Sequence, residues 1–394
     1  MQLLVAHSGR QHAHQLAQAL HEHRMLARYW TGVPTADPVT KGAMYKRIAQ
    51  GSPQPTTALP DGSVRHCYIA PMVRRIAKAV CTDPGVMVDW GHRADGWFDA
   101  WVARRVDWSR VDGVIGYENS ALHTFKAARR RGLPTILDAA SFHHAWQDQH
   151  YTYVESDAVH ARINRRKDEE IAQADHILTV SELARQSYLA AGVPADRVTS
   201  VPMGATLKDF APSPKPVQED VFTFLFVGQA GPRKGMDLLL QAARQLSDNG
   251  LDFNVQVAGG IDASMQDAIN EASAVQALGY LGRPALVEAL QAADCLVLPS
   301  RHDSFGRVVV EALATGTPVL VSEHVGAKEV ITEDVTGWTV PAEDAGALAD
   351  RMRWCITHRG EVRAMRDDAV QTAQQYSWAA YRKRVVDVIR NILD

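Results

Sequence analysis

Residues 299–316, PSRHDSFGRVVVEALATG, follow a predicted buried strand and open a predicted helix. The helix is expected to begin near Gly306, with Ser304 as its N-cap. The first backbone amides of a helix have no partner inside it, so they offer a site for an anion such as phosphate. The segment therefore predicts an anion cradle, made by the amides of Phe305, Gly306, Arg307 and Val308.

Two carboxylates accompany this cradle. Asp303 lies in the loop just ahead of the helix, and Glu311 follows eight residues later on the helix itself. Carboxylates around an amide cradle suit a ligand that carries hydroxyls as well as phosphates. Taken alone the pair is weak, because a capping residue and a solvated helix position would give the same spacing.

A second segment, FVGQAGPRKG (226–235), supplies positive charge. Gly228 and Gly231 permit close approach of the backbone, and Arg233 and Lys234 stand just before a predicted helix. Two cations at this place could neutralise a diphosphate and stabilise it as a leaving group. A solvated turn is the simpler interpretation of the pair alone. Gly9, after the first predicted strand, fits either an ordinary tight turn or a similar close approach.

The elements that must position these residues alternate between strands and helices. Strands are expected at residues 3–6, 28–30, 113–116, 135–138, 176–180 and in VFTFLFVG, FNVQVAGG, CLVLPS and PVLVS. Helices are expected at residues 11–21 and 121–131 and in MDLLLQAARQL, ALVEALQAA and VVVEALATG. Such alternation indicates an α/β fold with doubly wound parallel sheets, because parallel strands need crossover connections.

The chain has 394 residues, too many for one ordinary hydrophobic core. Residues 209–220 (DFAPSPKPVQED) have three prolines and no apolar period, which is typical of a linker. We predict a first domain at 1–208, a second at 221–376 and a final helix at 377–394 that packs back on the first. Residues 38–82 are expected to be irregular, with a mobile loop at 51–62. Ligands of such sheets bind at the carboxyl ends of strands, so the site is expected between the domains.

Composition narrows the class of protein. Apolar residues make up 46% and charged residues 22%, a globular balance, and the net charge of −3 gives no reason to expect nucleic acid. The four cysteines form no CxxC pair, so neither a disulfide framework nor a zinc site is indicated. No window approaches the ~18 apolar residues of a membrane span. MQLLVAH is expected to be a strand rather than a signal peptide. These features predict a cytoplasmic protein.

Taken in order, these segments resemble the retaining GT-B glycosyltransferases of family four, which include sucrose synthases and bacterial lipopolysaccharide and mannosyl transferases. The resemblance extends to LDAASFHHAWQ, EIAQADHILTVSE, VPMGATLKDF, LGYLGR and YSW. It implies a GT-B fold, in which two Rossmann-like domains face a cleft. The first domain would bind the acceptor and the second the nucleotide-sugar donor.

The resemblance also implies a role for each matched residue. Glu311 would bind the ribose hydroxyls of the nucleotide, and Asp303 the hydroxyls of the transferred sugar. Arg233 and Lys234 would sit on the phosphates. The remaining positions are the amides of Ser304 to Val308 on the sugar and diphosphate, Gly9 and Gly228 leaving room, Arg283 beside the base and His143 facing the reacting sugar.

Two positions depart from the family's pattern. The first acid is usually Glu, and the shorter Asp303 would move the sugar or select a different one. Gln229 stands where many relatives carry a phosphate-binding Arg, and Arg233 is the candidate to compensate.

We predict that the reaction needs neither a metal ion nor a cofactor. The chain contains no Asp-x-Asp, the motif with which single-domain sugar transferases hold a cation on the donor phosphates. Histidines crowd residues 12–23 and 143–144, but no cysteine or carboxylate completes a recognisable ligand set in the sequence. Charge neutralisation is therefore assigned to Arg233 and Lys234.

Basic clusters give residues 1–205 a net charge of about +4, against about −7 for the rest of the chain. They are Arg74–Arg75–Lys78, Arg104–Arg105 and Arg129–Arg130–Arg131. Solvated faces are one interpretation. The other is an acidic acceptor, or the anionic inner face of a membrane that carries a lipid-linked acceptor and holds the protein peripherally.

The sequence thus predicts a retaining glycosyltransferase that moves a sugar from a nucleotide-diphosphate donor to an acceptor hydroxyl. Polysaccharide, lipopolysaccharide or other glycoconjugate biosynthesis is the expected context. Retention would follow from departure of the diphosphate and entry of the acceptor on the same face. Two alternatives stay open: a nucleotide-sugar 2-epimerase-like isomerase and a non-catalytic nucleotide-sugar-binding protein.

Overall fold

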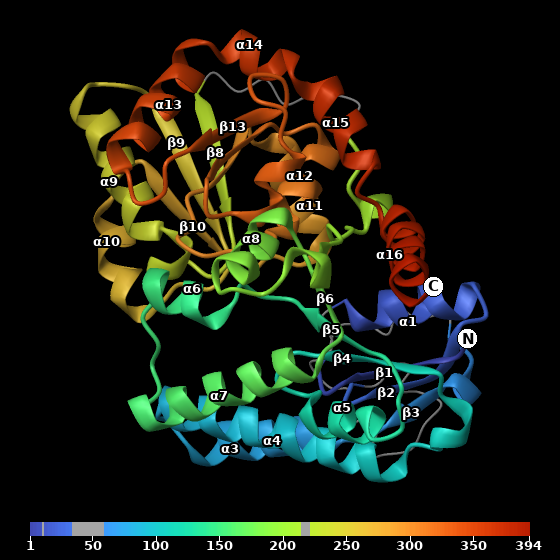
Figure 1. Cartoon of the computed structure of the whole chain (residues 1–394). Coiled ribbons are helices and arrows are strands. Elements are labelled where there is room, and N and C mark those ends of the chain that lie inside the picture. Colours follow the sequence, from blue (N-terminus) through green and yellow to red (C-terminus); the bar gives the residue numbers. More distant parts are fainter. Residues whose placement is uncertain (10–11, 34–58, 214–220) are drawn as a thin grey trace.

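A computed structural model describes residues 1–9, 12–33, 59–213 and 221–394, and arranges them around two parallel sheets (Figure 1). The first sheet has the strand order β3-β2-β1-β4-β5-β6-β7 and the second has the order β10-β9-β8-β11-β12-β13. The strands are β1 (Leu3–His7), β2 (Leu26–Thr31), β3 (Val64–His66), β4 (Gly113–Tyr117), β5 (Thr135–Ala139), β6 (His176–Thr179), β7 (Val198–Ser200), β8 (Phe222–Val227), β9 (Phe253–Ala258), β10 (Val275–Gly279), β11 (Cys295–Leu298), β12 (Val319–Ser322) and β13 (Gly337–Val340). The predicted doubly wound α/β fold is confirmed.

Helices connect these strands and cover both sheets. They are α1 (Ala13–Glu22), α3 (Ile69–Val80), α4 (Pro84–Arg105), α5 (Leu122–Arg129), α6 (His144–His150), α7 (Asp157–Gln173), α8 (Glu182–Ala190), α9 (Met236–Asp248), α10 (Gln266–Glu271), α11 (Arg283–Ala292), α12 (Arg307–Thr315), α13 (Ala345–Thr357), α14 (Arg359–Ala364), α15 (Arg366–Gln374) and α16 (Trp378–Leu393). In both sheets the chain order reverses beside the first strand of the sheet, β1 or β8. Such a reversal leaves a crevice at the carboxyl ends of the strands, where ligands bind.

The two faces of the first sheet contact different helices, because successive side chains of a strand point to opposite sides. Leu3 and Val5 of β1 join the core cluster that contains α1 and α16. Leu4 and Ala6 join the cluster that contains α3, α4 and α5. Both faces are therefore buried, as a parallel sheet requires.

The last helix of the chain lies against the first, far from its neighbours in sequence (Figure 1). Ser377 caps α16 by accepting a hydrogen bond from the amide of Ala380, at 3.2 Å. Tyr381 and Val385 are buried in the core that α1 shares, and Arg382 pairs with Glu22 at 3.0 Å. The division of the chain at residues 209–220 stays a prediction, since residues 214–220 lie outside the described part.

One sequence prediction about the first half is wrong. Residues 38–82 were expected to be irregular, but β3 and the helix α3 lie within them. Pro71 does not prevent α3, because proline is tolerated in the first turn of a helix, where no amide is needed. The loop predicted at residues 51–62 falls largely outside the described residues.

Candidate functional site

The predicted anion cradle lies at the carboxyl end of β11. The helix α12 begins at Arg307, and its N-cap is Gly306, whose φ of 85° is left-handed. A side chain at Gly306 would place its Cβ 3.0 Å from Cγ1 of Val325, so glycine suits both the backbone and the space. Among the described residues, no hydrogen-bond partner is recorded for the amides of Ser304 to Val308. Five donors at one helix start form a site for an anion.

The structure corrects the predicted cap of this helix. The Ser304 hydroxyl does not cap α12 but donates to the carbonyl of Ala140 after β5, at 2.8 Å. The Ser181 hydroxyl donates in return to the carbonyl of Ser304, at 2.7 Å. Ser304 therefore links the cradle to the first sheet, and Gly306 starts the helix two residues later.

The structure brings Lys234 and Asp303 together as an ion pair at the carboxyl ends of β8 and β11. Both side chains are largely buried, with 14% and 13% of their surface exposed. Arg233 lies beside them and donates from its guanidinium to the carbonyl of His302, at 2.9 Å. The cations of Arg233 and Lys234 therefore lie next to Asp303, which follows Lys234 by 69 residues in the sequence. All three lie beside the amides of the cradle.

Glycines allow this close arrangement of loops. A Cβ on Gly235, whose φ is 70°, would lie 1.9 Å from the carbonyl oxygen of Pro299. A Cβ on Gly259 would lie 1.9 Å from the carbonyl oxygen of Gly228, which itself has a φ of 143°. Gln229, the position that departs from the family's pattern, donates to Asp262 at 2.6 Å. The loop after β8 is thus held against β9 and β11 by backbone contacts that only glycine permits.

Glu311 lies on α12, one turn after Arg307. Burial raises the pKa of the Glu311 carboxyl, and the nearby guanidinium groups of Arg307 and Arg283 oppose this in part. No hydrogen bond or ion pair to its carboxylate is recorded among the described residues. Arg283, predicted to lie beside the base, pairs with Asp209 at 2.6 Å. Glu311 is therefore a partly buried acid whose acceptor oxygens are available to a ligand.

The first sheet contributes His143 and Gly9 from the ends of β5 and β1. The ring of His143 caps α6 by accepting from the amide of Ala145, at 3.2 Å, which leaves its proton on Nε2. Burial, with a smaller contribution from His144, lowers the pKa of His143 to about 4. The amide of Gly9 lies 3.3 Å from the ring of His7.

Aromatic and histidine rings from both halves meet next to the cradle, which the sequence did not predict. Phe142 lies edge-on to His302 at 5.0 Å between ring centroids, and Trp146 lies edge-on to His324 at 5.2 Å. Neither ring nitrogen of His302 has a partner in the part of the chain that is described. Burial and the neighbouring Arg233 lower the pKa of His302 to about 4. The sequence run SFHHAW contains Phe142 and Trp146, but only the fold shows which rings they contact.

A cavity of about 610 Å³ opens between residues 148–154 of the first half and Arg233 and Arg301 of the second. Arg301 is fixed there by two hydrogen bonds to Asp237, at 2.7 and 2.8 Å. These bonds and the nearby Glu343 raise the pKa of Arg301 despite its burial. The cavity therefore reaches the predicted phosphate site from the side of the first sheet.

The structure places a carboxylate beside the adjacent histidines, which the sequence did not show. Ligand atoms of His143, His144 and Asp168 lie within 4.8 Å of one another. However, Nε2 of His144 forms a hydrogen bond with the carboxylate of Asp168, at 2.6 Å, and Nδ1 of His143 accepts a hydrogen bond from the amide of Ala145. These groups already have protein partners, so we assign no metal to them.

Residues 208–375, which contain the cradle, Lys234 and Glu311, match the family described as Glycosyl transferases group 1. This part of the chain, the group 1 region, is similar to that family. The group 1 region begins near the predicted linker and ends just before α16. It covers the whole second sheet, whereas the first sheet lies outside the match.

Curated relatives of the chain are glycosyltransferases. It is 29% identical over 246 residues to D-inositol 3-phosphate glycosyltransferase 1 of Catenulispora acidiphila, covering 57% of this chain and 59% of that protein. It is 31% identical over 218 residues to the D-inositol 3-phosphate glycosyltransferase of Corynebacterium urealyticum, covering 50% and 51%. It is 29% identical over 189 residues to the amylovoran biosynthesis glycosyltransferase AmsK of Erwinia amylovora, covering 45% and 46%. The matches thus span about half the length of these relatives.

Solved structures show the same fold over the full chain. Anabaena Alr3699/HepE in complex with UDP superimposes with a TM-score of 0.67 at 16% identity, covering 99% of both chains. WaaG, a glycosyltransferase involved in lipopolysaccharide biosynthesis, gives 0.65 at 16% identity and the same coverage. The group 1 region is therefore one half of a GT-B fold, which confirms the predicted fold class.

Proposed function

We propose that the protein is a retaining glycosyltransferase that moves a sugar from a nucleotide-diphosphate donor to an acceptor hydroxyl without a metal ion. The observation that carries this proposal is the row of amides from Ser304 to Val308, which lies beside Lys234 in the group 1 region and has no recorded partner in the described part of the chain. Together they offer a helix start and a cation to one anionic group, which suits a diphosphate.

The hydroxyl-bearing parts of the donor would bind to the carboxylates. Glu311 has acceptor oxygens without a recorded partner in the described chain, so the ribose hydroxyls would supply the missing hydrogen bonds. Asp303, one residue ahead of the first free amide, would hold the transferred sugar. Arg283, at the start of α11, would lie beside the base.

Catalysis would be mainly electrostatic. Negative charge grows on the diphosphate as the bond to the sugar breaks, and fixed donors that favour this charge lower the barrier. Lys234, Arg233 and the amides would provide that stabilisation in place of a divalent cation. His143 is neutral at pH 7 because its pKa is about 4, so it would act on the sugar as a hydrogen-bond donor rather than as a charged acid. The acceptor would enter on the same face that the diphosphate leaves.

The acceptor would reach the sugar from the first half, where the cavity of about 610 Å³ meets Arg233. Relatives that act in amylovoran and lipopolysaccharide biosynthesis support a role in glycoconjugate biosynthesis. Both the cytoplasmic location and a peripheral contact with the membrane belong to this proposal. An isomerase or a non-catalytic binding protein is less well supported, because the named relatives are transferases.

A panel of nucleotide-sugars and nucleoside diphosphates tests the proposal by thermal shift in the presence of EDTA. The true donor and its diphosphate should stabilise the protein by about 2.7 kcal/mol at a concentration of 100 Kd. Labelled donor and an acceptor extract should then give a product with a retained anomeric configuration. No stabilisation by any member of the panel, or activity that returns only with Mg²⁺ or Mn²⁺, would contradict the proposal.

A further inference from the structure

The helices α3 and α4 expose an unusual amount of apolar surface. Of the eleven large hydrophobic side chains that are exposed among the described residues, six lie on these two helices. They are Met72, Ile76, Val80, Val86, Trp90 and Trp97. Only Ala70 and Ala77 of α3 are buried. An exposed apolar surface concentrated in this way marks a contact with another molecule.

The apolar residues of α3 form a stripe. Met72, Ile76 and Val80 follow one another at intervals of four, so they lie on one side of the helix, and their exposed fractions are 47%, 59% and 78%. On α4, Trp90 and Trp97 lie edge to face at 6.1 Å between ring centroids. Aromatic rings of this kind are favoured where an apolar phase meets water.

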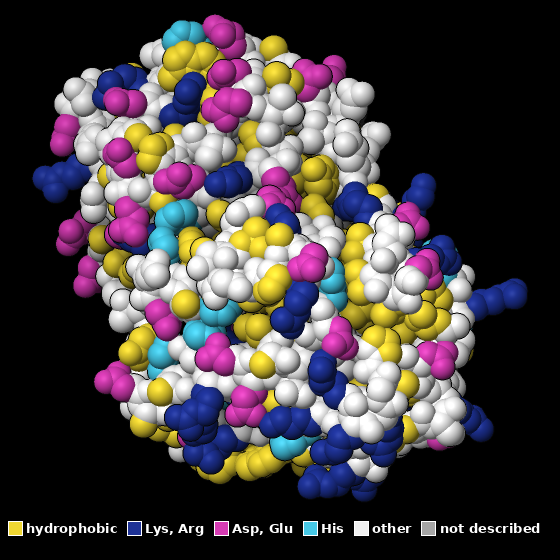
Figure 2. Space-filling view, in the orientation of Figure 1, with side chains coloured by type: hydrophobic (Ala, Val, Ile, Leu, Met, Phe, Trp, Pro, Cys, Tyr) yellow, Lys and Arg dark blue, Asp and Glu magenta, His cyan; other side chains and the backbone are white. Residues whose placement is uncertain are grey.

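Exposed cations accompany this stripe. Arg74, Arg75 and Lys78 are exposed on α3, and Arg104 and Arg105 are exposed at the end of α4. The acidic side chains of the two helices are mostly satisfied within the protein, since Asp95 pairs with Arg74 at 2.5 Å and Asp99 with Arg166 at 2.7 Å. Figure 2 shows hydrophobic and basic side chains side by side along the lower edge of the molecule, where Figure 1 places α3 and α4. The face therefore combines apolar groups with positive charge.

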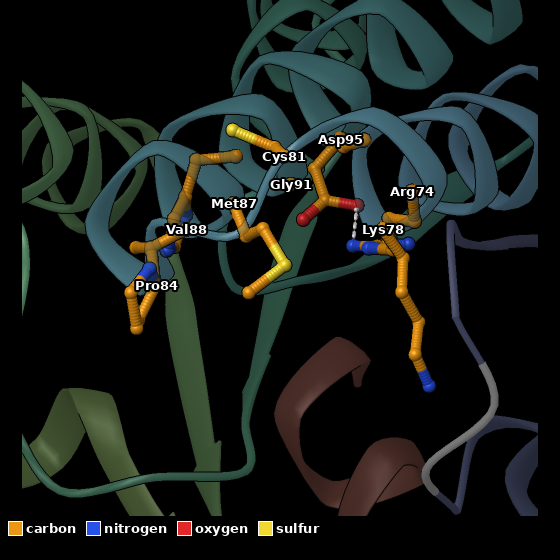
Figure 3. Close-up of a pocket in the computed structure, with 10 residues that line it drawn as sticks. Arg74, Lys78, Cys81, Pro84, Met87, Val88, Gly91 and Asp95 are labelled. Carbon is orange, nitrogen blue, oxygen red and sulfur yellow. Dashed lines mark hydrogen bonds and ion pairs between the residues drawn. The ribbon is translucent and has the colours of Figure 1, made fainter.

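A groove of about 870 Å³ lies between the two helices (Figure 3). Pro84, Met87 and Val88 form an apolar wall, and Arg74 and Lys78 stand at the other side. The groove leads inward to Asp95, which accepts a hydrogen bond from Ser8 at the end of β1. Its inner end therefore lies at the residue before Gly9, at the carboxyl end of β1.

We infer that the α3–α4 face docks on an anionic lipid bilayer, and that the groove admits a lipid-linked acceptor from that bilayer to the carboxyl end of β1. The apolar stripe would enter the boundary between headgroups and acyl chains, and the cations would contact anionic headgroups. The inference rests on the proposed function, which includes a peripheral contact with the membrane, and it names the surface and the lipid charge; vesicle binding tests the docking separately from sugar transfer. Among the described residues no helix is long and apolar enough to span a membrane.

Vesicle binding tests this inference with the full chain. The wild-type protein should bind vesicles of equal phosphatidylcholine and phosphatidylglycerol, bind phosphatidylcholine vesicles much more weakly, and dissociate as salt is raised. Ile76→Ser with Val80→Ser should weaken binding at least tenfold. Arg75→Ser with Lys78→Ser should weaken it about fivefold for each cation removed.

Matched changes on the second half serve as controls. Tyr280 and Val335 are 89% and 40% exposed, and Tyr280→Ser with Val335→Ser should leave vesicle binding unchanged. Nucleoside-diphosphate binding, measured by calorimetry in the same variants, should equal that of the wild type. A wild-type protein that binds nucleoside diphosphate but not anionic vesicles would overturn the docking and leave the proposed function in place. A wild-type protein that binds anionic vesicles but no nucleoside diphosphate would overturn the proposed function and leave the docking in place.

A second copy of the chain is the competing occupant of this face. Light scattering would then show a dimer that Ile76→Ser with Val80→Ser converts to a monomer, without any affinity for vesicles. That result, or equal binding to neutral and anionic vesicles, would overturn the inference.

Discussion

The helices α12 and α3 differ in the groups that they leave available to a ligand. These groups are polar backbone amides at α12 and apolar side chains at α3. The start of α12 leaves five backbone amides without a recorded partner among the described residues. At α3 apolar side chains are exposed to solvent. An unpaired amide favours an anion, whereas uncovered apolar surface favours an apolar phase. The contrast is the basis of our two proposals, that α12 binds the donor and that α3 contacts a membrane.

Removal of the Lys234 charge should have the largest effect. Lys234→Ala should lower kcat about 10²–10³-fold and raise the donor KM far less, because the charge stabilises the transition state more than the ground state. Lys234→Arg should restore part of the rate, since it keeps the partner of Asp303. Lys383→Ala, an exposed change on α16, is the control. A near-normal kcat for Lys234→Ala in steady-state assays would remove the proposed role.

Loss of the Glu311 carboxylate should weaken donor binding while it stabilises the free protein. Because burial raises the pKa of Glu311, the folded protein holds that proton more tightly than the unfolded chain does. This contribution to stability is complete at pH values below the unfolded pKa and is lost as pH rises through the raised pKa. Glu311→Gln should therefore raise the unfolding temperature at pH 7.

The same variant should bind the nucleoside diphosphate about 5- to 100-fold more weakly, because a charged acceptor of hydroxyl hydrogen bonds is gone. Calorimetry measures this effect, with Glu288→Ala on the exposed side of α11 as the control. Unchanged affinity would mean that the Glu311 carboxylate does not contact the nucleoside diphosphate.

A side chain at Gly306 should disturb the cradle itself. Gly306→Ala and Gly250→Ala both force alanine into a left-handed conformation, with φ of 85° and 72°, at a cost of about 1–2 kcal/mol in stability. Only the Cβ at Gly306 meets a close neighbour, at 3.0 Å, whereas nothing lies within 4 Å of the one at Gly250. Donor affinity should fall about tenfold in Gly306→Ala alone. An equal loss in both variants would show a general stability effect instead.

The smallest effect concerns the rings between the two halves. Burial lowers the pKa of His302 to about 4, so its neutral form stabilises the fold above the unfolded pKa, and this stability is lost as pH falls from about 6.5 toward 4. His302→Phe should therefore flatten the decline of the unfolding temperature between pH 6.5 and 4. His21→Phe on α1 should leave the decline unchanged. A steep decline in His302→Phe would assign the acid sensitivity to other groups.

The loops and helix around the cradle could be predicted from the sequence better than the contacts between the two halves, for a physical reason. Gly228, Lys234 and Glu311 lie in short segments whose strand, turn and helix follow from local spacing, so their grouping could be anticipated. The cap of α12 was predicted wrongly because Ser304 bonds to Ala140, 164 residues away, and such a contact leaves no local pattern. His302 was missed for the same reason, since it meets Phe142 only in the folded protein.

The face of α3 was missed because its pattern contradicts the usual rule. An amphipathic helix in a globular protein buries its apolar side, but Met72, Ile76 and Val80 point to the solvent. The Arg74–Arg75–Lys78 cluster was noticed as charge, and only the structure shows that apolar side chains lie next to it. Charge can thus be counted from the sequence, whereas exposure cannot.

The most direct test of the central claim is the release of nucleoside diphosphate from a panel of UDP-, GDP- and ADP-sugars, in EDTA, with and without anionic membrane extract. We expect that one donor is turned over, that labelled sugar appears in the lipid fraction, and that Lys234→Ala abolishes most of this turnover. We also expect that Ile76→Ser with Val80→Ser lowers transfer to lipid while donor binding is kept. Turnover that needs added metal, or that Lys234→Ala leaves intact, would contradict the account.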